Sequence, residues 1–120
     1  MPNLTIEYTS NLPAFDTRRL LAACNRAMAE SGHFQESDIK SRALCVEDFV
    51  IGTSAEPRAF VHASFALLSG RSADIKRDLA QRLLSILEER FPPVPGLEIQ
   101  LLVELRDMER ESFQKRYLKA

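Results

Sequence analysis

The sequence has few of the residues that build disulfide frameworks, metal sites or nucleophilic triads. Its 120 residues include only two cysteines and two histidines. Cys24 and Cys45 are too few for a disulfide framework and lack metal-ligand spacing, so we expect both to be reduced residues of the core. Neither Ser10 nor Ser64 has a histidine partner for nucleophilic catalysis, and no histidine stands beside Cys45 to form a thiolate.

An excess of one charge and long apolar runs are also missing. The 16 basic and 17 acidic residues give a formal net charge of -1, with no basic excess to neutralise phosphates or to favour an anionic membrane. No glycine-rich phosphate motif is present. The chain shows neither a signal-peptide pattern nor an apolar run of about 18 residues, so we expect a cytoplasmic protein.

The size of the chain limits its architecture. At 120 residues and 13.6 kDa, with 45% hydrophobic and 28% charged residues, it is expected to form one soluble domain spanning 1–120. One small domain has little room for a deep pocket. A site shared between subunits is therefore expected.

Strands are predicted from two patterns. The first and last segments alternate apolar with polar residues, which is typical of a half-buried strand. The two segments between them are rich in β-forming residues, and one is apolar almost throughout, as strands buried on both faces are. The four predicted strands are 3–9, 39–49, 59–68 and 97–105.

Two helices are predicted from apolar residues at helical spacing. The first follows Asp16 or Thr17, either of which can cap it, and ends near Gly32. The second begins after Ser72, another capping residue, and continues to Phe91, where a proline-rich segment stops it.

The element order is a β-α-β unit repeated, with halves at 1–50 and 58–105 and a charged tail at 106–120. This order predicts an α+β fold with four main strands in one sheet and both helices on one face. Both faces of the central strands look apolar, which predicts oligomerisation through the open side of the sheet. Phe113 and Tyr117 lie at helical spacing in the tail, and we expect them to dock on another subunit.

Met1-Pro2 carries the most chemical information. If Met1 is removed, Pro2 becomes an N-terminal secondary amine, and a free α-amine titrates at about 7.7–8.0. Such an amine can accept a proton at neutral pH as a general base, whereas the nitrogen of an internal proline is an amide. The alternative is that Pro2 is an ordinary start of a strand.

Five short segments, beginning with Met1-Pro2, occur in an order and spacing that cover the chain to about residue 105. They are weak individually and strong together with the β-α-β repeat. The segments are Met1-Pro2, Ser31-Gly32-x-Phe34, Ile39-Lys40-Ser41-Arg42, Ala59-Phe60-Val61-His62 and Gly70-Arg71-Ser72. Together they resemble the 5-carboxymethyl-2-hydroxymuconate Δ-isomerase family of the tautomerase superfamily.

The resemblance implies a tautomerase-like fold, a homotrimer and a reaction without cofactor or metal. Pro2 would be the general base that moves a double bond in an unsaturated 2-hydroxy or 2-oxo polycarboxylate, as in bacterial homoprotocatechuate degradation. Arg71 and Lys40 would be the cations that meet the substrate, and Arg42, Phe34 and Phe60 would help to bind it. No nucleic acid or membrane partner is implied.

The sequence departs from the family pattern at one of these positions. The family pattern Ile-Arg-Ser-Arg stands here as Ile39-Lys40-Ser41-Arg42. A lysine is a point charge, whereas arginine is a planar fork that matches a carboxylate, so the exchange is not conservative. Keto-enol tautomerisation, decarboxylation or dehalogenation of another enol or unsaturated acid therefore remains an alternative.

Simpler interpretations stand beside each assignment. Arg71 is alternatively a solvated turn residue, and Lys40 and Arg42 are alternatively surface charges. Phe34 and Phe60 are alternatively core or interface residues. His62, inside an apolar strand, is expected to be a hydrogen-bonded structural residue. A non-catalytic binding module on the same fold is the alternative from a different class, and retention of Met1 would favour it.

Overall fold

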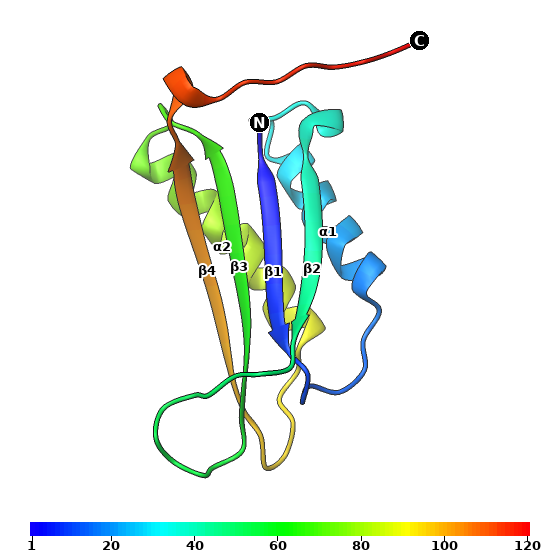
Figure 1. Ribbon diagram of the computed structural model, residues 1–120, viewed down its shortest axis with the longest axis vertical. Coiled ribbons are helices and arrows are strands. Elements are labelled where there is room, and N and C mark those ends of the chain that lie inside the picture. Colours follow the sequence, from blue (N-terminus) through cyan, green and yellow to red (C-terminus); the bar gives the residue numbers. More distant parts are fainter.

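The computed structural model describes residues 1–120 and contains one four-stranded sheet with two long helices (Figure 1). The sheet order is β2-β1-β3-β4, with β1 antiparallel to β3 at the centre and parallel to β2, and with β3 parallel to β4. The elements are β1 (Asn3–Thr9), α1 (Thr17–Glu30), β2 (Lys40–Val46), β3 (Arg58–Leu68), α2 (Ala73–Arg90) and β4 (Glu98–Met108), with short 3-10 turns η1 (Glu36–Asp38) and η2 (Arg110–Ser112).

Capping residues set where both long helices begin. The Asp16 carboxylate accepts a hydrogen bond from the backbone N–H of Arg19 at 3.1 Å, and the Ser72 hydroxyl accepts one from Ile75 N–H at 3.2 Å. These bonds satisfy backbone donors that have no partner within the helix. The chain leaves α1 through Gly32 at φ +82°, a conformation that favours glycine. The predicted helices are confirmed.

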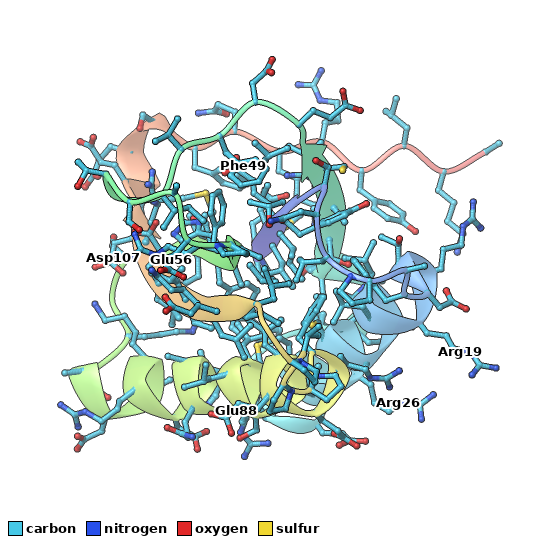
Figure 2. All side chains as sticks on the ribbon, turned by 90° about the horizontal axis from the view of Figure 1, so that it is seen from below. Arg19, Arg26, Phe49, Glu56, Glu88 and Asp107 are labelled. Carbon is cyan, nitrogen blue, oxygen red and sulfur yellow. The ribbon has the colours of Figure 1, made fainter.

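Both helices cover the same face of the sheet, where the hydrophobic core forms (Figure 2). Leu4 and Ile6 of β1 and Phe65 of β3 point toward the helices and are fully buried. The helices contribute buried residues at helical spacing: Leu20, Cys24 and Met28 from α1, and Leu79, Leu83 and Leu87 from α2. This arrangement confirms the predicted fold class. Neither helix is both long and apolar enough to cross a membrane.

The open face of the sheet is mainly polar, so the prediction of two apolar faces on the central strands is wrong. Asn3, Thr5 and Glu7 of β1 alternate with the buried residues and point away from the helices. On β3 the residues of this face are half-buried, and His62 places its Nε2 atom 2.9 Å from Glu104 Oε1. Burial of apolar surface on this face therefore gives little reason for oligomerisation.

Two segments at the sheet edges differ from the sequence prediction. Strand β2 ends at Val46 rather than Phe49, and Cys45 near its end is exposed, so its assignment to the core is wrong. Strand β2 lies at the edge of the sheet with one neighbouring strand only, and its residues near the end are exposed. The tail forms a single 3-10 turn and then runs extended, with Tyr117 70% exposed, so the helical spacing of Phe113 and Tyr117 does not correspond to a helix.

The two β-α-β halves repeat one another in detail at the starts of their strands. Lys40 N–H donates to the carbonyl of Pro2 at 3.2 Å, and Glu98 N–H donates to the carbonyl of Pro57 at 3.2 Å. Each proline immediately precedes the first strand of its half, and each bond joins it to the parallel strand of the same half. Pro2 and Pro57 are therefore equivalent positions at opposite ends of the sheet.

Candidate active site

The start of β1 places Pro2 between two neighbouring strands. Pro2 is buried, and the hydrogen bond from Lys40 N–H to its carbonyl fixes it against β2. The next residue, Asn3, lies opposite Lys40 on β2 and Ala66 on β3. Side chains at the start of β2 and at the end of β3 therefore meet at the amino terminus. The sequence predicted the strand pairing that brings Lys40 to Pro2.

Arg71 follows the end of β3 and is held in one orientation by three contacts. Its Nη2 atom donates to the carbonyl of His33 at 3.1 Å, and its Nη1 atom donates to the carbonyl of Leu68 at 3.3 Å. The guanidinium carbon lies 4.7 Å from the centre of the Phe34 ring, within the range of a cation–π contact. Phe34 packs edge-to-face on buried Phe65, with ring centres 5.7 Å apart. The guanidinium is thus preorganised and still half-exposed.

Lys40 reaches the amino terminus from the other side. Its ammonium group donates to the carbonyl of Asp38 and lies 3.3 Å from the sulfur of Met1. Burial lowers the pKa of Lys40 below its ordinary value, and the nearby Lys115 and Arg42 lower it further, while Asp38 acts in the opposite direction. Lys40 is therefore a cation of the site whose position depends on the backbone of Asp38.

The electrostatic surroundings of the amino terminus favour a neutral amine. Burial lowers the pKa of the Met1 amino group below its ordinary value, and the guanidinium of Arg71 is the next largest cause. Lys40 and Lys115 act in the same direction, and Asp38 alone acts against them. Pro2 lies about 3.8 Å further along the chain, the spacing of consecutive Cα atoms, so its nitrogen shares these surroundings.

Arg42 lies on the open face of the sheet, two residues further along β2 than Lys40. Its guanidinium donates to Asn3 Oδ1 at 3.0 Å and to Thr5 Oγ1 at 3.3 Å. It therefore lies beside the first residue after Pro2, and it contributes to the positive charge around Lys40. Neither Lys40 nor Arg42 forms an ion pair with a carboxylate.

Phe60 is the one predicted site residue that the structure does not bring to Pro2. It begins β3 beside the end of β1, where its N–H donates to Thr9 Oγ1 at 3.2 Å. Seven residues of strand at about 3.3 Å each separate Thr9 from Pro2, or roughly 23 Å. The ring of Phe60 instead contacts Phe49 of the loop before β3, with ring centres 6.3 Å apart.

Two apolar cavities also lie at the far end of the sheet. They have volumes of about 370 and 280 Å³ and share Phe91 and Ile99 in their walls. Each contains a single titratable residue, Glu88 in one and Arg90 in the other. A lone charged group in an apolar recess offers no acid–base pair, so the amino-terminal cluster is the better candidate.

Sequence reasoning missed an ion pair beside the candidate base. Lys115 of the tail places its Nζ atom 2.5 Å from Asp38 Oδ1, which lies just before β2. The only sequence signal was the charge of the tail, and 77 residues separate the partners. Lys115 lowers the pKa of Asp38 below its ordinary value, chiefly through this hydrogen bond.

Comparison with solved structures identifies the class of protein. A 5-carboxymethyl-2-hydroxymuconate isomerase from Deinococcus radiodurans R1 is 29% identical, with a TM-score of 0.88 over 96% of this chain and 88% of that chain. A 5-carboxymethyl-2-hydroxymuconate delta-isomerase is 15% identical, with a TM-score of 0.79 over 98% of this chain and 88% of that one. A fused 4-OT in a symmetric trimer is 14% identical, with a TM-score of 0.70 over 92% and 89%. The fold is that of the tautomerase superfamily.

The family follows from the sequence itself. The family model described as 5-carboxymethyl-2-hydroxymuconate isomerase matches residues 2–119. This chain therefore belongs to the 5-carboxymethyl-2-hydroxymuconate isomerase family, and it is an isomerase. A comparison with curated proteins found no match. Family membership confirms the predicted resemblance and favours the enzyme over the non-catalytic module.

Proposed function

We propose that this isomerase, with Met1 removed, moves a double bond in an unsaturated 2-hydroxy or 2-oxo polycarboxylate and uses Pro2 as its general base. The observation that carries the proposal is the convergence of Arg71 and Lys40 on the amino terminus, with the pKa of the amine there lowered by burial and by Arg71. A lowered pKa raises the fraction of the amine that is unprotonated at neutral pH and can accept a proton.

The residues of the site supply each part of a proton transfer that uses no cofactor. Pro2 accepts a proton from one position of the conjugated enol and returns it at another, so the double bond moves and no atom is gained or lost. Negative charge grows on the substrate oxygen during the transfer, and the fixed Arg71 guanidinium stabilises it. Lys40 and Arg42 hold carboxylates of the substrate, and Phe34 forms the apolar wall beneath Arg71.

The substrate that we propose is 5-carboxymethyl-2-hydroxymuconate, in the breakdown of an aromatic acid. The family match and the number of cations near Pro2 support a polycarboxylate. The alternative is a tautomerase, decarboxylase or dehalogenase that acts on a different enol or unsaturated acid. Lys40 favours this alternative, because its ammonium is engaged by the Asp38 carbonyl and lacks the two-pronged geometry of arginine.

We also propose that the protein is a homotrimer. The similar 4-OT structure is a symmetric trimer, and Arg71 and Lys40 are only partly buried within one chain, so a neighbouring subunit can pack beside them. Phe60 contacts substrate in this arrangement only if a neighbouring subunit brings it there. Light scattering of the purified protein tests the proposal, and a monomeric mass at assay concentration would contradict it.

The function is tested by following 5-carboxymethyl-2-hydroxymuconate through its ultraviolet absorbance. The protein must be shown by intact mass to begin at Pro2, and protein that retains Met1 is the first control, expected to be inactive. A Pro2→Ala variant keeps an α-amine but not the secondary amine, and we expect it to lose most of the activity. Full activity in Pro2→Ala would move the base elsewhere. Turnover of another enol acid, with none of this compound, would favour the alternative.

A further inference from the structure

The tail returns over the amino-terminal end of the sheet and is attached there at two points. In Figure 1 the tail, drawn in red, crosses above the amino terminus. At the start of the tail, Arg110 Nε donates to the carbonyl of Ser69 at 2.7 Å, two residues before Arg71. Further along, Lys115 Nζ lies 2.5 Å from Asp38 Oδ1, two residues before Lys40. The two attachments thus flank the two proposed catalytic cations.

Asp38 contacts two lysines near the amino terminus, one through its backbone and one through its side chain. Its backbone carbonyl accepts a hydrogen bond from Lys40, and its carboxylate pairs with Lys115. Around the amine are Arg71 after β3, Lys40 on β2, Asp38 on η1 and Lys115 on the tail, with Arg42 one step further along β2. Asp38 is the only anion among them.

We propose that Lys115 is a positioning residue of this site, which pairs with Asp38 and so prevents the one nearby carboxylate from holding a proton on the Pro2 amine. The proposal rests on the assignment of Pro2 as the base. It gives the tail a function that is separate from substrate binding and from the chemistry at Arg71.

The physical argument is one of charge balance. An isolated Asp38 carboxylate would stabilise a protonated amine and raise its pKa, and a neighbouring ammonium cancels that effect. The Asp38 carboxylate is ionised at neutral pH with or without Lys115, and Lys115 lowers its pKa further, so the pair persists there. Without Lys115, the ionised carboxylate would remain and its partner would be gone. The unprotonated fraction of Pro2 at neutral pH would then fall.

The direct test is the titration of Pro2 itself, followed by NMR in protein with ¹⁵N-labelled proline and without Met1. We expect Lys115→Met to move the midpoint to higher pH and Lys115→Arg to leave it near the wild-type value. Adding Asp38→Asn to Lys115→Met should reverse the shift, because the carboxylate is then also gone. Lys119→Met changes an exposed lysine of the same tail and should leave the midpoint unchanged.

A second measurement uses activity. On the acid limb of the pH profile, kcat/KM of Lys115→Met should fall roughly two- to fivefold, the effect expected of one solvent-exposed charge a few ångströms away. The profiles of the other variants should follow their Pro2 midpoints. An unchanged or lowered Pro2 midpoint in Lys115→Met would overturn the proposal, and so would an equal shift in Lys119→Met. A shifted midpoint in a protein that isomerises no substrate would support the pairing and contradict only the assigned function.

Discussion

Replacing Arg71 by alanine separates two contributions of the same side chain. The substitution removes two hydrogen bonds to backbone carbonyls and a cation–π contact with Phe34. A hydrogen bond contributes about 1 kcal/mol net, and an exposed cation–π contact about 0.5–1 kcal/mol. The free energy of unfolding should therefore fall by roughly 2–3 kcal/mol, which lowers the melting temperature by roughly 8–12 °C in a domain of this size.

The loss of activity in Arg71→Ala should be much larger than the loss of stability explains. Removing one preorganised group that stabilises the developing oxyanion lowers kcat by about 10²–10³. Arg71→Lys retains the charge but not the fork that spans the carbonyls of His33 and Leu68, so we expect it to recover only part of the activity. Arg77→Ala is the matched control, since Arg77 is an exposed arginine of α2 that pairs with Asp74 in the preceding turn.

Thermal melts and steady-state rates of the isomerisation, measured on the same preparations, give both quantities. If Arg71→Ala melts earlier but keeps kcat within about threefold of the parent, Arg71 is a structural residue and the proposed electrostatic role is wrong. If the melting temperature does not move, the two carbonyl contacts contribute no stability and the estimate above is refuted.

Three further predictions concern other parts of the chain. Ser72→Ala should cost about 1 kcal/mol of stability through loss of the α2 cap, whereas Ser85→Ala in the exposed middle of α2 should change it by less than about 0.5 kcal/mol; equal melting temperatures would contradict this. Burial raises the pKa of the Cys24 thiol to about 11, so a thiol reagent at pH 8 should label Cys45 alone in the folded protein and both cysteines after unfolding. Two labels in the folded protein would refute the burial argument. Lys40→Arg restores the family pattern and should raise kcat/KM for 5-carboxymethyl-2-hydroxymuconate roughly five- to tenfold, mainly through KM, and a decrease would favour a different substrate.

Local signals were sufficient to predict most of the fold. Strand β1 and the starts of both helices depend on the alternation after Pro2 and on the caps Asp16 and Ser72, which act within a few residues. The match between Pro2 and the start of β2 then followed from parallel pairing. Contacts that depend on which face of a strand a residue occupies were harder. The apolar appearance of β3 concealed the fact that His62 and its neighbours alternate onto a polar face.

Long-range contacts account for what the sequence could not reveal about the site. The pairing of Asp38 with Lys115 joins residues 77 positions apart, and no periodicity links them. The orientation of Arg71 depends on carbonyls of His33 and Leu68, which carry no sequence signal because every residue has a carbonyl. Arg71 and Lys40 were therefore predictable as residue types, whereas their geometry was not.

Pro2 and Pro57 occupy equivalent positions in the fold, so only the order of the chain determines which of them has a free amine that can act as a base. Each proline carbonyl accepts a backbone hydrogen bond from the neighbouring parallel strand, but the residue opposite the start of β3 is Glu98, whereas the residue opposite the start of β1 is Lys40. A circularly permuted chain that joins the tail to residue 2 and begins at Pro57 would keep every strand in place. Its only proline amine would lie beside the Arg58–Glu98 ion pair instead of beside Lys40 and Arg71, and its old base would be an inert amide. The duplicated architecture thus contains two sites of one shape, and charge has made them chemically unlike.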